Sequence, residues 1–214
     1  MYKELEINGK KINYRKWKVK DKKNFDNAVS VIDKRKIMVY DCLENPVPLD
    51  IEEYNYLLCL IRDYSLNEDI HYSVECYNCD TLNEINLSIQ DIVSFKEMDF
   101  SPIVINKTVI ELQNIKDINS YEETVTNTLT NLEKYIADLS FHVKTINSSD
   151  VSQTEVLDYI YNLDIDIFNK LIKEWDKRKN KCIYKDKFIC PNCGKEIEFN
   201  FENIPNFFPE SWKL

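Results

Sequence analysis

The chain has 214 residues, of which 43% are hydrophobic, and this suits one medium domain or a core with an inserted subdomain. The formal net charge of −9 disfavours non-specific nucleic-acid binding, because an acidic surface repels phosphate backbones. Only two glycines occur, which argues against a glycine-rich nucleotide-binding loop, and no apolar stretch is long enough to predict a membrane span. Seven cysteines without an apolar leader predict synthesis in a reducing compartment, where metal binding is favoured over disulfides.

The first part of the chain, 1–70, is predicted to contain a hairpin and two helices. Asn8-Gly9 is a strong two-residue turn signal between segments of alternating polarity. Asp50, followed three residues later by Glu53, is typical of a capped helix start. The predicted elements are a hairpin over 2–17, a helix from Asp21 to about Tyr40 and a helix over 51–66.

Two Cys-x-x-Cys turns stand in matching contexts far apart in the chain. Cys76 and Cys79 open one, Cys190 and Cys193 the other, and an alternating apolar segment follows each turn. One turn supplies two thiolates, whereas a structural zinc ion takes four ligands. We therefore predict that the four cysteines together hold one structural zinc ion. The alternative is that each pair forms a turn without a metal.

The expected meeting of the two Cys-x-x-Cys turns defines the predicted fold class, which is α+β. The chain is expected to be a zinc ribbon split into two Cys-x-x-Cys hairpins by an inserted helical subdomain, with an N-terminal hairpin in front. The first ribbon half is assigned to 71–92. The mainly helical insertion is assigned to 93–186, and the second ribbon half with an aromatic tail to 187–214.

The insertion carries the clearest helical periodicity of the chain. Short strands are expected around 103–110, and apolar residues recur at helical spacing from Val125 to Val143. The predicted elements after these strands are a helix from Ser120 to Val143, a linker over 144–150, and helices from Ser152 to Leu163 and from Asp164 to Lys179.

No arrangement of side chains predicts catalysis. His71 precedes Cys76 by five residues and could replace a metal ligand, although a surface position is the favoured alternative, and His142 is expected on a helix. Cys42, Cys59 and Cys182 are expected to behave as small apolar residues, and the less favoured alternative for Cys182 is that it competes as a metal ligand. The chain has no P-loop, dinucleotide fingerprint or catalytic metal motif, so we predict that it is not an enzyme. A zinc hydrolase would require an open coordination position.

Aromatic and basic residues near both ends predict partner-binding surfaces. Aromatic side chains near a terminus often dock onto a partner, although here they could instead cover the ribbon. A basic run over 16–23 could contact phosphates or an acidic protein partner, although a solvated junction between a strand and a helix is the favoured alternative. The predicted partner-binding residues are Phe207, Phe208, Trp212, Arg15 and Trp17.

The order of these segments also carries a resemblance. An arginine-aromatic start enters a charged helix over 14–23, and an acidic-capped helix ending in arginine and serine follows over 49–65. A Cys-x-x-Cys turn with an alternating strand comes next, and a late Cys-x-x-Cys turn precedes a short Phe207-Phe208 end. This pattern resembles the baseplate hub proteins of T-even-type contractile-tailed bacteriophages.

The resemblance implies a structural or assembly component of the tail baseplate hub. Such a protein is made in the host cytoplasm, is located in the virion tail baseplate, and contacts other baseplate or tail hub proteins within an oligomeric assembly. The alternative function is a zinc-ribbon nucleic-acid-binding or transcription-associated phage protein. The ribbon segments argue against nucleic acid as a partner, because they carry five glutamates against few lysines. These are Glu75, Glu84, Glu196, Glu198 and Glu202.

Overall fold

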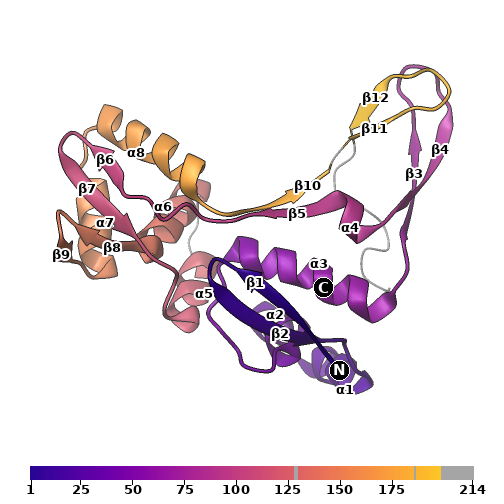
Figure 1. Ribbon diagram of the computed structural model, residues 1–214, viewed down its shortest axis with the longest axis horizontal. Coiled ribbons are helices and arrows are strands. Elements are labelled where there is room, and N and C mark those ends of the chain that lie inside the picture. The colour runs from indigo at the N-terminus through magenta and orange to yellow at the C-terminus, as the bar shows by residue number, and fades with distance from the viewer. Residues whose placement is uncertain (128–129, 186, 199–214) are drawn as a thin grey trace. The chain divides into compact units, whose positions relative to one another are not determined.

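The structure, a computed structural model, describes residues 1–127, 130–185 and 187–198 (Figure 1). It is a mixed α+β fold with 43% helix and 27% strand, which agrees with the predicted class at that level. The described residues contain no helix that is both long and apolar enough to cross a membrane. The chain divides into two compact units. Among the described residues, unit 1 comprises Met1–Pro46, Glu53–Lys96 and those from Cys182 onward, and unit 2 comprises Val47–Glu52 and those within Glu97–Lys181.

Unit 1 begins with the predicted hairpin. Its two strands pair antiparallel around Asn8 and Gly9, whose φ values of 49° and 72° suit a tight two-residue turn. The elements of unit 1, of which α3 and β10 begin in unit 2, are β1 (Tyr2–Ile7), β2 (Lys10–Arg15), α1 (Val19–Asn27), α2 (Val31–Met38), η1 (Tyr40–Cys42), α3 (Ile51–Leu66), β3 (Ile70–Glu75), β4 (Leu82–Leu87), α4 (Ile89–Ile92), β5 (Val93–Lys96), β10 (Lys181–Tyr184), β11 (Lys187–Ile189) and β12 (Glu196–Glu198).

The single helix predicted from Asp21 to about Tyr40 was wrong, because two helices, α1 and α2, occupy this segment. Ala28 is extended, and Ser30 caps α2 by accepting a hydrogen bond of 3.0 Å from the Asp33 N–H. A serine at this position satisfies a backbone donor that a continuous helix would use. Asp21 lies inside the first turn of α1, where its carboxylate accepts a hydrogen bond from the Lys18 N–H.

In the described part of unit 2, a four-stranded antiparallel sheet, in the order β6-β7-β8-β9, is combined with the helices α5 to α8. Its core joins Ile103 and Ile110 of the sheet to Leu139, Leu171 and Trp175 of the helices. The elements of unit 2 are β6 (Ile103–Ile105), β7 (Thr108–Leu112), α5 (Ile118–Asn127), α6 (Asn131–His142), β8 (Val143–Ile146), β9 (Ser149–Asp150), α7 (Gln153–Tyr161) and α8 (Ile165–Arg178).

Two predictions for unit 2 require correction, whereas its last two helices lie where they were expected. The helix predicted from Ser120 to Val143 is two helices, because Thr130 and Glu133 form a capping box that starts α6. The linker predicted over 144–150 is instead the paired strands β8 and β9, joined by a turn at Asn147 and Ser148. A two-residue turn in the left-handed region allows this short segment to reverse and pair with itself.

Candidate metal centre

Each predicted Cys-x-x-Cys turn lies at the end of a hairpin in unit 1. Strands β3 and β4 pair antiparallel from Ile70 with Leu87 to Glu75 with Leu82. Strands β11 and β12 pair antiparallel from Lys187 with Glu198 to Ile189 with Glu196. The cysteine turns connect these strands, so the chain direction at each turn is fixed by its own strand pairing.

The two turns use the same backbone hydrogen bond. The Cys76 N–H donates to the carbonyl of Thr81 at 2.9 Å, and the Cys190 N–H donates to the carbonyl of Lys195 at 2.8 Å. Each of these bonds joins the first cysteine of a turn to the residue five positions later and so closes the loop that contains both cysteines. The matched sequence contexts therefore give matched local structures.

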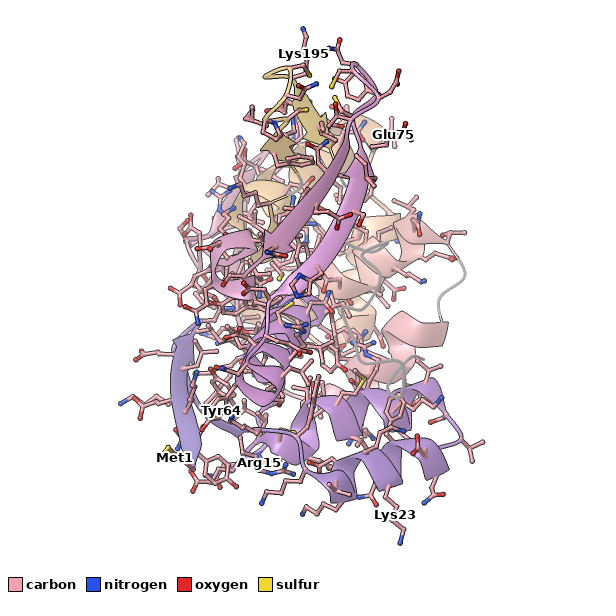
Figure 2. All side chains as sticks on the ribbon, turned by 90° about the vertical axis from the view of Figure 1, so that its right-hand side faces the viewer. Met1, Arg15, Lys23, Tyr64, Glu75 and Lys195 are labelled. Carbon is pink, nitrogen blue, oxygen red and sulfur yellow. The ribbon has the colours of Figure 1, made fainter. Side chains whose placement is uncertain are left out.

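The two turns meet and bring four sulfur atoms together. The Sγ atoms of Cys76 and Cys193 are 3.7 Å apart, and those of Cys79 and Cys190 are 3.8 Å apart. All four Sγ atoms lie within 4.8 Å of one another. Zinc–sulfur bonds of about 2.3 Å in a tetrahedron place neighbouring sulfurs about 3.8 Å apart. In Figure 2, Glu75 and Lys195, which flank the two turns, lie at the same end of unit 1.

Apolar side chains enclose one side of this cluster. Cys76 and Cys190 are fully buried, and Cys79 and Cys193 are partly exposed. Ile197 is buried against the cysteines, as part of a small core that Val74 and Phe188 extend. All the cysteines are free thiols, and sulfurs of a disulfide would be only about 2.0 Å apart. The cluster therefore has the composition and spacing of a closed four-thiolate site that could bind a metal.

Polar neighbours favour the thiolate form of two of these cysteines. The Thr81 hydroxyl, 3.2 Å from Cys79 Sγ, and the Asn192 amide, which donates to that sulfur at 3.5 Å, lower the pKa of Cys79 to about 6. Burial tends to raise the pKa of Cys190, but hydrogen bonds from backbone N–H groups of its own turn outweigh it and lower the pKa. Burial raises the pKa of Cys76 to about 11, and a bound cation would favour its thiolate form.

The family comparison agrees with the resemblance found in the sequence. The model of the family described as T4 bacteriophage base plate protein matches residues 1–209. The chain belongs to this family. Searches of the curated proteins and of the solved structures gave no significant match. Membership supports a structural component of the phage tail baseplate whose partners are other tail proteins.

The other ligands considered for this base plate protein lie outside the cluster. His71 lies on β3 with an exposed ring next to the Asn86 side chain. Cys59 and Cys182 belong to a separate buried core, and His142 lies in unit 2. Within the described residues, the set able to hold a metal contains only the four predicted cysteines.

The residues predicted to bind partners fall into two groups. Arg15 is 7% exposed and forms an ion pair of 2.6 Å with Asp21. The Trp17 indole N–H donates to the carbonyl of Met38 at 2.8 Å. Both side chains therefore make contacts inside unit 1, and their partner role stays a prediction. Phe207, Phe208 and Trp212 lie outside the described residues, and so does Glu202.

Sequence reasoning missed the polar residues that surround the sulfurs. Thr81 and Asn192 come from different hairpins, and the Asn192 amide donates to the Thr81 hydroxyl at 2.9 Å. Asn83 is 6% exposed, and its amide oxygen lies 3.7 Å from Cys190 Sγ. These contacts form only when the hairpins meet. The one available signal is that each polar residue lies within four positions of a cysteine.

Proposed function

We propose that this chain is a zinc-stabilised structural component of the phage tail baseplate hub that acts through protein–protein contacts. Family membership supports the baseplate part of this proposal. The zinc part is supported by the single most informative observation, four cysteine sulfurs within 4.8 Å of one another on two hairpins. The hub assignment follows from the segment order described above.

Zinc at this position would join two segments that are remote in sequence. Among the described residues, the buried core shared by the two hairpins consists of Cys76, Cys190 and Ile197. So small a core cannot hold two hairpins together by apolar burial alone. Structural zinc sites in small domains contribute roughly 10 kcal/mol or more of apparent binding free energy, which becomes folding free energy. The ion would therefore fix the end of unit 1 as a rigid element.

The donor set supports a structural role for the metal. Four thiolates complete the tetrahedral coordination of zinc and leave no position for water or substrate. Catalytic zinc sites keep such a position open. We therefore propose that the protein is not an enzyme, and that it contacts other baseplate proteins within an oligomeric assembly of the virion tail.

Quantitative peptide mass spectrometry on purified virions tests the structural role. We expect peptides of this chain at a few copies per particle, in constant ratio to other baseplate proteins. Virions assembled with Cys190→Ser as the only source of the chain should contain less of it. The matched Cys42→Ala change removes a buried thiol outside the cluster and should leave its amount unchanged. Absence of the chain from particles, with presence in infected lysate, would overturn a permanent structural role.

A further inference from the structure

Unit 2 contains a groove between the edge of its sheet and one helix. Strand β6 is the edge strand of the order β6-β7-β8-β9, and Figure 1 shows it between β7 and α8. The groove has a volume of about 300 Å³. Its lining comes from the β6 edge and its turn, and from one face of α8. The lining residues are Val104, Ile105, Asn106, Lys170, Lys173, Glu174 and Lys177.

The strand register leaves the backbone of Val104 facing this groove. Ile105 pairs with Thr108 across a two-residue turn, which makes them a hydrogen-bonded pair. Val104 and Val109 are then the next, non-hydrogen-bonded pair, so the backbone groups of each point away from the other strand. The Asn147 N–H donates to the Val109 carbonyl at 2.8 Å, which agrees with this register because the Val109 carbonyl then points away from β6. The Val104 N–H and carbonyl therefore point to the open edge.

The side chains of the groove combine an exposed apolar residue with positive charge. Val104 is 63% exposed. Lys170, Lys173 and Lys177 are also exposed, and their spacing places them along one face of α8. Lys177 pairs with Glu174 at 2.6 Å and Lys170 with Asp166 at 3.7 Å, whereas Lys173 has no ion-pair partner among the described residues. Three lysines against one glutamate make this groove basic on a chain whose net charge is −9.

We propose that the groove binds an extended acidic segment of a partner protein. The segment adds to the free edge of β6 through the backbone of Val104 and places its carboxylates against the lysines of α8. Strand addition supplies backbone hydrogen bonds, and alternate side chains supply specificity. This inference goes beyond the proposed function, because it specifies the chemistry of one partner and depends on neither zinc nor the hub. The competing explanation is that the lysines only keep a short edge strand from pairing.

Fluorescence anisotropy of the purified full-length chain separates these explanations. The probe is a labelled octapeptide of alternating valine and glutamate, compared with one of alternating valine and lysine, at low ionic strength. We expect the acidic peptide to bind at least about tenfold more tightly than the basic one. The triple change Lys170→Glu, Lys173→Glu, Lys177→Glu should weaken its binding by about tenfold or more. The same change at Lys11, Lys116 and Lys134, which are exposed and lie outside the groove, alters net charge equally and should have little effect.

The backbone contact has its own test. Val104→Pro removes an N–H that the β6–β7 pairing does not use, and proline is tolerated at sheet edges in this situation. We expect it to weaken binding of the acidic peptide about fivefold or more while the melting temperature stays the same. If Val104→Pro does not fold, a peptide N-methylated at alternate residues tests the reciprocal hydrogen bond, from the peptide N–H to the Val104 carbonyl. Equal binding of both peptides, equal loss in the two triple variants, or full binding by the N-methylated peptide would overturn the proposal.

Discussion

Asp80 and Gly194 occupy the same position in the two cysteine turns and have the same backbone conformation. Their φ values are 54° and 70°, both in the left-handed region. The Asp80 N–H donates to the carbonyl of Cys76 at 2.8 Å, and the Gly194 N–H donates to that of Cys190 at 2.9 Å. The second turn thus has glycine where the backbone needs a positive φ, whereas the first has aspartate, which adopts this conformation at a cost in free energy.

Exchanges at these two positions should have opposite effects on stability. Gly194→Ala should lower the free energy of unfolding by about 1 kcal/mol, because alanine resists positive φ. A Cβ at Gly194 would meet no heavy atom within 4 Å, so backbone conformation alone determines the effect. Asp80→Gly should raise the free energy of unfolding by roughly 0.5 kcal/mol. Urea unfolding of the two variants measures both changes, and a Gly194→Ala variant as stable as the original would contradict the account.

Three hairpin turns of the chain begin with asparagine and share one geometry. Asn8-Gly9, Asn106-Lys107 and Asn147-Ser148 all have positive φ at both residues. Lys107→Gly and Ser148→Gly should each raise the free energy of unfolding by roughly 0.5–1 kcal/mol, because glycine adopts this conformation without strain. Gly9→Lys, the reverse exchange, should lower it by a similar amount. Thermal and urea unfolding provide the measurement, and stabilisation by neither glycine would show that these turns are not strained.

The same turns explain which strands the sequence could predict. Asn8-Gly9 combines two residues that favour positive φ, so the first hairpin was confirmed. Asn147-Ser148 forms the same kind of turn, but this pair is a weaker turn signal than Asn-Gly. The segment that forms β8 and β9 was therefore predicted to be a linker. The prediction of helix ends was wrong for a related reason. Ser30 and Thr130 cap helices inside segments whose apolar periodicity continues across the cap, so periodicity alone joined two helices into one.

The candidate metal centre was likewise predicted only in part. Cys76, Cys79, Cys190 and Cys193 could be predicted as a group, because two Cys-x-x-Cys turns in matched contexts supply the four ligands that a structural zinc ion takes. The contact of Asn192 with Thr81 depends on two hairpins meeting in space, and no local pattern encodes it. The groove beside β6 could not be predicted from the sequence either, because it depends on strand register and on the position of α8.

The ion pair of Arg15 with Asp21 should contribute to the stability of unit 1. Burial tends to raise the pKa of Asp21, but hydrogen bonds from Arg15 and from the Lys18 N–H outweigh it and lower the pKa. Arg15→Met leaves a buried carboxylate without its cation and should cost about 2–3 kcal/mol at neutral pH. Lys16→Met, one residue along the chain, serves as the control and should cost much less. Equal losses for the two variants, by urea unfolding, would contradict this.

The same pair predicts a dependence on pH. A folded-state pKa below the ordinary value of about 3.9 gives stability that is present above that value and lost as pH falls through the folded-state pKa. The stability difference between the original chain and Arg15→Met should therefore be constant near neutral pH and shrink below about pH 4. Release in acid of the proposed zinc ion would affect both proteins alike, so the comparison of the two isolates the carboxylate. A difference that stays constant down to the lowest pH measured would exclude titration of Asp21.

The zinc content of the purified full-length chain tests the central claim most directly. Elemental analysis should find one zinc ion per chain in the original protein and in Cys42→Ala, which lacks a buried thiol far from the cluster in sequence. Cys190→Ser removes one of the four clustered sulfurs and should contain little zinc and melt at a lower temperature. A protein that folds stably with no bound metal, or a Cys190→Ser variant with full zinc and unchanged melting, would contradict the account.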